Sequence, residues 1–218
     1  MDLLLTDREV RVLAALIEKE ITTPDYYPLS LNALTNACNQ KSNRHPVMAL
    51  DEQAVHEVLD SLNRKYLAGP ASNAESRVTK FEHRIPEVFN FDRRETALLC
   101  ELMLRGPQTL GELRSRTERM YRFEDLESLE ATLQKLSERQ PPLVKKLPRL
   151  PGTKEPRYAQ LLAGDQPEWS IAAAEPAPAP DSHAPDERVT QLAAEMEEIK
   201  RQLANLQQQF AEFKKQFE

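Results

Sequence analysis

Glycine, cysteine and aromatic residues are scarce in this 218-residue sequence, which has five Gly, two Cys and 6% aromatic residues. So few glycines disfavour the Gly-rich loops that hold nucleotide phosphates, and sixteen prolines favour helices separated by stiff turns. Cys38 and Cys100 lie in apolar helical patterns, so we expect buried free thiols rather than a disulfide. The shortage of aromatic residues predicts a mostly aliphatic core.

The sequence also lacks long hydrophobic runs and metal-binding patterns. No apolar run approaches the roughly 20 residues that cross a bilayer, and the N-terminus has no basic region of a signal peptide. We therefore expect a cytoplasmic protein that does not contact membranes. The four His are scattered, and the spacing of Cys38, His45 and His56 does not match a zinc site. We also find no distinguished acid pair, so we expect no metal, no cofactor, no catalytic residue and no enzyme activity.

Positive charge is not in excess over the whole chain. The formal net charge is −6, and residues 167–218 contribute most of it, with 5 Lys+Arg against 10 Asp+Glu. Residues 1–166 are nearly balanced, with 24 Lys+Arg against 25 Asp+Glu. This balance excludes a globally basic nucleic-acid-binding protein, so only a local basic patch could contact phosphates.

The sequence does contain a repeat of capped helices. Thr6 and Glu9 form the pattern of a capping box at the start of the first predicted helix. Asp92 and Glu95 form the same pattern 86 residues later. Apolar residues follow at helical spacing in both copies, which predicts two matching helices that each bury one face.

Each copy continues with two more helices and an extended stretch broken by a turn. Ser30 and Thr109 precede the second helices, and Asp51 and Asp125 precede the third helices, as helix-capping residues do. Three helices followed by a hairpin are the order of a winged helix-turn-helix. We therefore predict a mainly α fold with small β-hairpins, in two tandem winged-helix domains. The predicted domains are residues 1–86 and residues 87–166.

The C-terminal part of the chain has a different pattern. Residues 167–186 are rich in Pro and Ala and are typical of a solvated linker. In residues 187–218 the spacing of apolar residues alternates between three and four, which predicts a coiled-coil helix. The alternative is an amphipathic helix folded onto the body, but the strict period favours a homo-oligomer. The predicted oligomerisation residues are Val189, Leu192, Met196, Ile199, Leu203, Leu206, Phe210, Phe213 and Phe217.

Basic residues gather in the second copy, on and after its second helix and in its hairpin. Between residues 143 and 157 there are five basic residues and one acidic residue. These cations are candidate contacts to DNA phosphates, and the alternative is a solvated basic face. The third helices begin with acidic residues near Asp51 and Asp125, which would repel DNA, so any binding must use these cations. The candidates are Arg114, Arg116, Arg119, Arg122, Lys145, Lys146, Arg149 and Lys154.

A polar segment separates the second and third helices of the first copy. It is longer than the three or four residues that usually join the helices of a helix-turn-helix. Its amides and cations could hold a phosphate, a carboxylate or the backbone of a partner protein. The alternative is that its amide side chains satisfy the backbone of their own loop. The candidate residues are Asn39, Gln40, Lys41, Asn43 and Arg44.

Several short strings in the sequence carry a resemblance to a known family. They include residues 22–24 (TTP), 27–30 (YPLS), 37–41 (ACNQK), 77–80 (RVTK) and 111–116 (GELRSR). With them, about residues 5–162 resemble the YceH family of uncharacterised bacterial proteins, and the C-terminal heptad helix is similar too. The resemblance implies tandem winged-helix domains in the bacterial cytoplasm. It implies no established activity and supplies no catalytic residues.

Two functional hypotheses follow from the sequence. The first is a DNA-associated regulator that binds through the basic surface of the second domain. The second is a protein-protein interaction adaptor that does not bind nucleic acid and that uses the Asn39–Val47 segment to hold an unidentified protein. The acidic third helices favour the adaptor, and the Arg cluster favours DNA. Because winged-helix units commonly bind nucleic acid, the sequence slightly favours the regulator.

The heptad pattern predicts self-association of the full-length chain. A helix with such a seam buries its apolar side chains by pairing with another copy. We expect light scattering to give a dimer or small oligomer at about tens of micromolar protein, a concentration at which even a coiled coil of modest affinity should associate. Deletion of residues 187–218 should leave a folded body of lower association state. A monomeric full-length chain would contradict this prediction.

Overall fold

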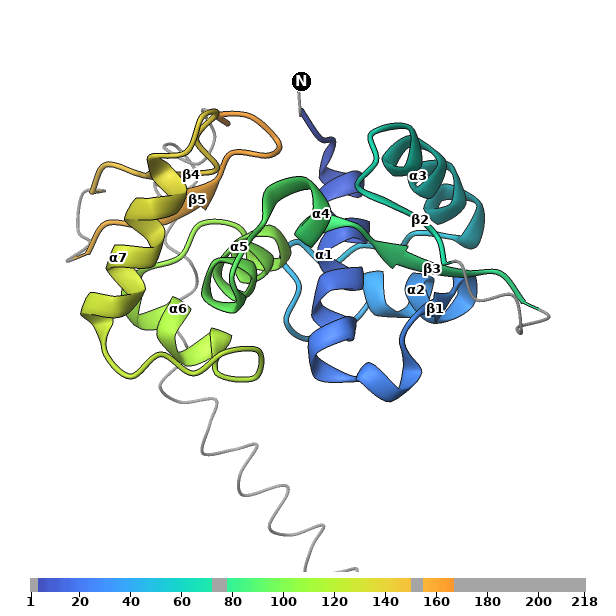
Figure 1. Ribbon diagram of the computed structural model, residues 1–218, viewed down its shortest axis with the longest axis horizontal. Helices are drawn as coiled ribbons and strands as arrows, with labels where there is room; N and C mark the ends of the chain where they lie inside the picture. The colour runs from blue at the N-terminus through green and yellow to red at the C-terminus, as the bar shows by residue number, and fades with distance from the viewer. Residues whose placement is uncertain (1–3, 72–77, 150–154, 167–218) are drawn as a thin grey trace, which may run out of the picture. The chain divides into compact units, whose positions relative to one another are not determined.

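Seven α-helices and two small antiparallel sheets make up residues 4–71, 78–149 and 155–166, the parts of the chain that the computed structural model describes (Figure 1). This confirms the predicted class of a mainly α fold with small β-hairpins. The predicted linker and coiled-coil residues lie outside the described residues.

The first half consists of α1 (Asp7–Thr22), the 3-10 turn η1 (Pro24–Tyr26), β1 (Leu29–Ser30), α2 (Leu31–Cys38), α3 (Glu52–Arg64), β2 (Ala68–Pro70), β3 (Lys80–His83) and α4 (Ile85–Phe89). The second half consists of α5 (Arg93–Arg105), α6 (Leu110–Thr117), α7 (Leu126–Ser137), β4 (Val144–Lys146) and β5 (Tyr158–Gln160).

The helix starts are fixed by the capping residues that the sequence indicates. The Glu9 carboxylate accepts a hydrogen bond from the Thr6 backbone N–H at 2.7 Å, and the Thr6 hydroxyl accepts one from the Glu9 backbone N–H at 3.3 Å. Asp92 starts α5 with the same reciprocal box, and Thr109 starts α6 with a third. Each cap stabilises its helix by about 1 kcal/mol, since it satisfies backbone donors that the helix cannot. These predictions are confirmed.

Both predicted hairpins are present, and each belongs to a small sheet. In the first half β3 pairs antiparallel with β2 on one side and with β1 on the other. In the second half β4 pairs with β5, with Lys145 opposite Ala159, and Gln108 forms a bridge to Tyr158. The strand β1 and the Gln108 bridge were not predicted, because segments of one or two residues carry no readable period. In each half, this pairing joins the segment before the second helix to the hairpin of the same half.

The helix α4 joins the two halves and was not predicted either. Its first turn contains Pro86, and it ends at Asn90, which has a left-handed backbone with φ of 51°. Ile85 is buried in the core, so this short helix is anchored rather than free. The expected boundary between residues 86 and 87 falls inside α4. The division into two domains stays a prediction, because the described residues of both halves belong to one unit.

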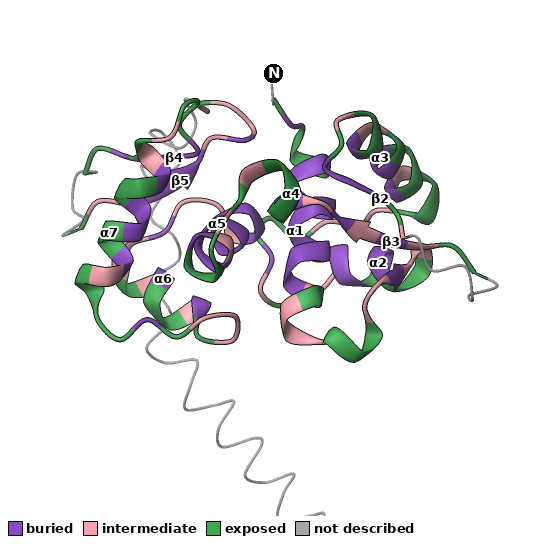
Figure 2. Ribbon diagram, viewed as in Figure 1, coloured by how far each residue is buried: buried purple, intermediate pink, exposed green. Residues whose placement is uncertain are grey.

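The helices α1 and α5 lie against each other at the centre of this unit, and both are buried on most sides (Figure 2). Leu13 and Leu99, which occupy matching positions of the repeat, are fully buried there. The thiol of Cys100 donates a hydrogen bond to the carbonyl of Ala14 at 3.4 Å, and these two residues also differ by the repeat offset of 86. The repeats therefore meet at equivalent positions, as two subunits do around a two-fold axis. One apolar cluster runs through both halves.

No helix in the described ranges combines the length and the apolar character that crossing a bilayer requires. The longest, α1, has 16 residues and includes several charged side chains. It is buried by other helices of the same chain.

The shared core predicts that the two halves unfold together. Replacing Leu99 by Ala removes buried methyl groups from the α1–α5 contact and should cost about 2–5 kcal/mol of unfolding free energy. We expect calorimetry to show one transition that moves as a whole to lower temperature. The exposed change Val88→Ala serves as the control and should alter stability by less than about 0.5 kcal/mol. Two transitions, with only one shifted by Leu99→Ala, would contradict a single cooperative unit.

Candidate functional site

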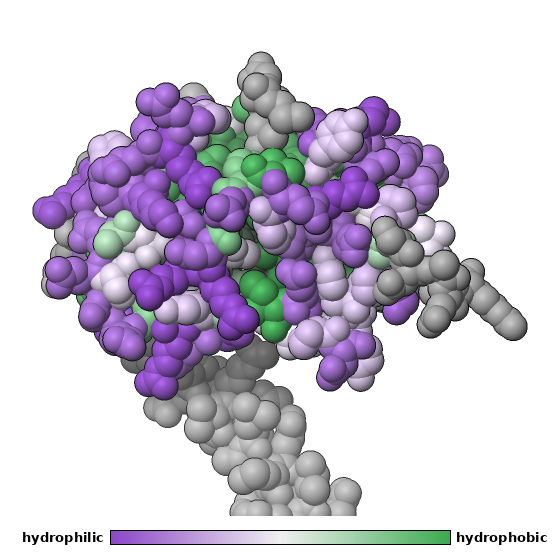
Figure 3. Space-filling model, in the orientation of Figure 1, coloured by the Kyte–Doolittle hydropathy of each residue, from purple (hydrophilic) through white to green (hydrophobic). Residues whose placement is uncertain are grey.

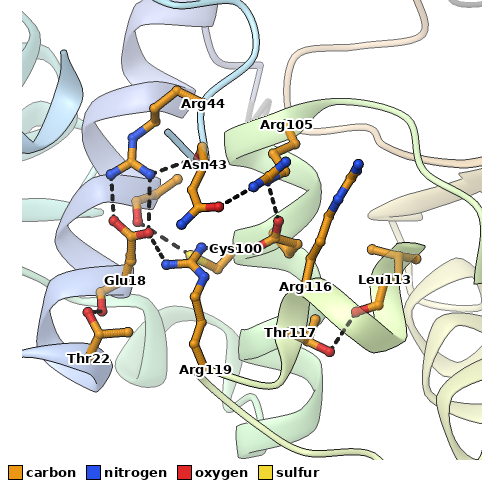
Figure 4. A network of polar contacts seen from close by, with 12 residues as sticks. Glu18, Thr22, Asn43, Arg44, Cys100, Arg105, Leu113, Arg116, Thr117 and Arg119 are labelled. Carbon is orange, nitrogen blue, oxygen red and sulfur yellow. Dashed lines mark hydrogen bonds and ion pairs between the residues drawn. The ribbon is translucent and has the colours of Figure 1, made fainter. Parts of the chain in front are cut away.

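The clearest polar arrangement in the described chain is a buried ion network between α1 and α5 (Figure 4). Glu18, in α1, pairs with Arg44 at 2.5 Å and also with Arg119. Arg119 reaches on to Glu101, in α5, with 2.9 Å between its Nη2 and the Oε2 of the carboxylate. Arg105 completes the network, with its Nε 2.9 Å from the Oε1 of Glu101. One guanidinium, that of Arg119, thus bridges carboxylates from the two halves.

The burial of this network sets its energetic weight. Glu18 and Glu101 are 1% and 0% exposed, and Arg44 is 5% exposed. A carboxylate in such a place must be paired and hydrogen-bonded, since an unpaired buried charge costs several kcal/mol. Arg44 meets this need with two nitrogens on Glu18, and it also donates to the carbonyl of Ala37 at 2.8 Å. The expectation of no distinguished acid pair was therefore wrong.

The network joins two loops between helices that are far apart in the sequence. Asn43 and Arg44 come from the α2–α3 connection, and Arg119 comes from the α6–α7 connection. The backbone N–H of His45 donates to the carbonyl of Leu104 at 2.9 Å, and the Asn43 amide oxygen accepts from Arg105. Asn43 has φ of 57°, a left-handed backbone that Asn tolerates better than most residues. The connection of the first half is thus docked on the last turn of α5.

Most polar side chains of the candidate partner-binding loop therefore form hydrogen bonds or ion pairs within the chain. The Asn39 side chain donates to the Leu50 carbonyl at 2.7 Å and accepts from the Leu50 N–H at 2.8 Å. Asn43 and Arg44 belong to the ion network. Gln40 is half-buried and Lys41 is exposed. The alternative from the sequence, in which an amide side chain hydrogen-bonds the backbone of its own loop, is therefore correct for Asn39.

Burial and neighbouring charge set the pKa values of the titratable groups at this interface. Burial would raise the pKa of Glu18, but the hydrogen bonds and charges of Arg44 and Arg119 hold it below its usual value. Burial raises the pKa of the Cys38 thiol to about 12 and that of Cys100 well above its usual range. Both cysteines are buried and free, as predicted. Neither forms a thiolate near neutral pH, so neither suits nucleophilic chemistry.

Most of the candidate DNA-binding cations in the second half face a carboxylate. Arg119 is bound to Glu18 and Glu101, and Arg114 donates to the carbonyl of Glu124 at 2.8 Å. Arg149 is exposed, and Lys154 lies outside the described residues. The remaining pairs are Arg116–Glu112 at 3.1 Å, Arg122–Glu118 at 3.6 Å, Lys145–Asp165 at 2.5 Å and Lys146–Glu130 at 3.4 Å.

A surface hollow lies between α6 and the start of α7, and we call it the α6–α7 groove. Its volume is about 370 Å³. Leu126, the first residue of α7, is 43% exposed at this hollow, while Phe123 is buried at it. The complete set of lining residues is Gly111, Arg114, Ser115, Glu118, Arg122, Phe123 and Leu126.

Sequence reasoning missed the buried acid Glu101, although the chain contains a signal for it. Glu101 is the one charged residue between Ala97 and Leu104, and all eight of these residues are buried. A helix that is apolar on every side is buried on every side, so a charge inside it needs an internal partner. Within the described ranges, no group of three His, Cys, Asp or Glu side chains could hold a metal ion.

Comparison with known proteins places the chain in a family. A family model described as "Protein of unknown function, DUF480" matches residues 5–153. The chain belongs to this family. Its relatives include UPF0502 proteins of Solibacter usitatus, 54% identical over 218 residues, and of Geobacter sulfurreducens, 49% identical over 223 residues, with all of both chains covered in each case. A UPF0502 protein of Koribacter versatilis is 53% identical over 201 residues, covering 91% of this chain and 92% of that one. The resemblance to an uncharacterised bacterial family is confirmed.

The network predicts a defined acid sensitivity. The pKa of Glu18 is lowered in the folded state, so its contribution to stability is complete above the unfolded value of about 4.3. This contribution is lost as the pH falls through the lowered folded pKa, because Glu18 is then protonated in the folded state as well as in the unfolded state. Glu18→Gln should cost about 3–5 kcal/mol at pH 7, since it leaves Arg44 buried without its carboxylate.

Urea unfolding at pH 7 and at several pH values below 5 tests this prediction. The Glu18→Gln protein should lose less further stability on acidification than the wild type does. The surface change Asp60→Asn is the control, because the Asp60 side chain is exposed and pairs at 3.4 Å with an exposed His56. An equal loss of unfolding free energy on acidification in wild type and Glu18→Gln would show that Glu18 does not determine the stability at low pH.

Proposed function

We propose that the chain is a non-catalytic adaptor of two winged-helix units, which holds a partner protein in its α6–α7 groove. The observation that carries this proposal is a second half in which most of the candidate cations face a carboxylate, together with an open, partly apolar hollow. The buried, protonated thiols support a non-catalytic role. The heptad seam at residues 187–218 supports a homo-oligomer, which would present several grooves to one partner.

The winged-helix assignment is supported by the order of the elements. Each half has a first helix, a short segment paired with the hairpin, two more helices and then the hairpin itself. The paired segments, β1 and the residue Gln108, both come directly before the second helix. This repeated order is what a helix-turn-helix followed by a wing requires.

Electrostatics favours a protein partner over DNA. Phosphate binding gains its strength when free cations release the counterions of the nucleic acid. Here Arg116 and Arg122 already face glutamates one helical turn away, and Arg119 is held in the buried network. The N-termini of α3 and α7 present Asp51 and Asp125, whose carboxylates cap their helices. A phosphate backbone would therefore meet acidic groups and cations that are already paired.

The α6–α7 groove has the features of a protein-binding pocket. Exposed Leu126 beside buried Phe123 supplies an apolar wall, and covering a leucine is worth roughly 1.5–3 kcal/mol. Arg114 and Arg122 also line it, and the Arg122 side chain is 83% exposed. Arginine beside apolar surface is enriched where proteins bind proteins. Because Arg122 pairs with Glu118 and Arg114 donates to a backbone carbonyl, we expect the apolar wall, rather than charge, to select a partner segment with an exposed apolar side chain. The face that Figure 3 shows is mostly hydrophilic, with apolar residues exposed near the middle of the view.

The groove predicts that one substitution abolishes partner binding while a matched one does not. Leu126→Asp places a charge where the apolar anchor of the partner would lie, and it should weaken binding by about 30-fold, as for a hot-spot residue. Val88→Asp is the matched control, since Val88 is 38% exposed on α4 of the other half. The tagged full-length proteins serve as bait in nuclease-treated lysate, and the captured partner is then titrated as a purified protein. Equal affinity of both variants, or no partner after nuclease treatment, would contradict the proposal.

The same proteins decide the DNA alternative. They are titrated with an arbitrary duplex at about 50 mM salt, where phosphate contacts are strongest. The adaptor should bind no DNA under these conditions. Binding that falls steeply with salt, and that weakens on replacing Arg116 and Arg122 by Glu, would restore the regulator hypothesis and contradict the adaptor.

A further inference from the structure

A second hollow lies between α1, the α2–α3 connection and the end of α5. It is a cavity of about 120 Å³, which is room for about four water molecules at roughly 30 Å³ each. Val10, Met48, Leu102 and Met103 form its apolar walls. It shares no lining residue with the α6–α7 groove, so its function is independent of the proposed adaptor site.

Two charged residues line this cavity, Asp7 and Arg11, and Arg11 is 2% exposed. Its Nη1 donates to the carbonyl of Cys38 at 3.2 Å, and its Nη2 donates to the carbonyl of Pro46 at 2.7 Å. Its Nε is buried without a hydrogen-bond partner among the described residues. Burial lowers the pKa of Arg11 and the nearby charge of Arg44 lowers it further, while the charge of Glu18 opposes this shift. Two carbonyls are thus its hydrogen-bond acceptors in the described structure.

The charges around Arg11 do not balance. The α1–α5 interface contains two buried carboxylates, Glu18 and Glu101, and both are already shared by other cations. Those cations are Arg44, Arg105 and Arg119. Arg11 is a fourth cation, and no ion pair to a carboxylate is found for it in the described part of the chain. The charge of Glu18 acts favourably on Arg11 without touching it, and a bound anion would supply the direct contact that this buried guanidinium lacks.

The polar groups at the mouth of the cavity leave room for such an anion. Asp7 accepts a hydrogen bond from the Gln166 amide at 3.2 Å, so this carboxylate already has a donor. His45, whose backbone is fixed to Leu104, is exposed at the cavity. The cavity therefore combines one buried cation and apolar walls with the polar side chains of Asp7, His45, Gln160 and Gln166.

We propose that this cavity binds a small aliphatic carboxylate, with its anionic group at Arg11 and its short chain against Met48 and Met103. The volume holds about four heavy groups, which are the carboxylate and the next carbon of such an acid, so a chain of about three to five carbon atoms continues into the mouth of the cavity. The apolar walls distinguish such an acid from inorganic phosphate, which has no apolar part. The pairing is charge-assisted, which makes it stronger than a neutral hydrogen bond.

Methionine methyl groups give a direct test on the full-length protein. The chain has five Met, and two of them line the cavity, so protein labelled with ¹³C-methyl methionine reports on it without labelling any ligand. The protein is titrated with butyrate, with the neutral isostere butyramide and with inorganic phosphate. Met120 is the internal reference, because it lies outside the cavity lining.

We expect butyrate to shift the Met48 and Met103 signals in a saturable way and to leave Met120 unchanged. Butyramide should bind about tenfold or more weakly, since it loses the charge-assisted pair with Arg11. Arg11→Met should remove the butyrate response, and the butyramide comparison tests the proposal even if this variant does not fold. Equal responses to butyrate and butyramide, a response to phosphate alone, or no saturable shift would each overturn the assignment.

Discussion

The Arg119 guanidinium, bridging Glu18 and Glu101, is the contact on which the rest of the structure depends. It joins a carboxylate of α1 to a carboxylate of α5, so it ties the two halves at the place where both are buried. Arg119 belongs to the α6–α7 connection, and Phe123 and Leu126 of the groove follow it within seven residues. The anchoring of Arg119 therefore holds the segment that leads to these two groove residues, so an interior contact helps to position a surface feature.

The same contact explains why a count of basic residues is a poor guide to DNA binding here. Arg114, Arg116, Arg119 and Arg122 form one cluster in the sequence, but they have different environments in the structure. Arg119 is taken up by buried carboxylates, while Arg116 and Arg122 face glutamates four residues before them. Free cations, rather than all cations, determine attraction to phosphates. Formal charge in a sequence overestimates this attraction when the acids lie one helical turn away.

The sequence predicts local features of this fold well and long-range charge pairing poorly. Capping boxes such as Thr6–Glu9 involve residues three apart, so their pattern is visible in the chain itself. The hairpins follow from extended stretches broken by turn residues. The Glu18–Arg119 pair joins residues 101 apart, and a pattern of spacing carries no information on such a pair. The usable signal was the charge of Glu101 within an apolar run, which marks a buried group but does not name its partner.

An interface that uses buried charges gives up some stability, because well-packed apolar residues of the same volume are often equally stabilising or better. Such an interface gains a geometric requirement instead, since each guanidinium must meet its carboxylate in the correct place. Glu18, Arg44 and Arg119 satisfy that requirement together, with both oxygens of Glu18 in use. Arg11 sits in the same interface, but a cavity and two carbonyls stand where a carboxylate would be expected. Because Glu18, Glu101, Arg44, Arg105 and Arg119 all take part in ion pairs and Arg11 takes part in none among the described residues, a carboxylate from outside the chain would complete the set.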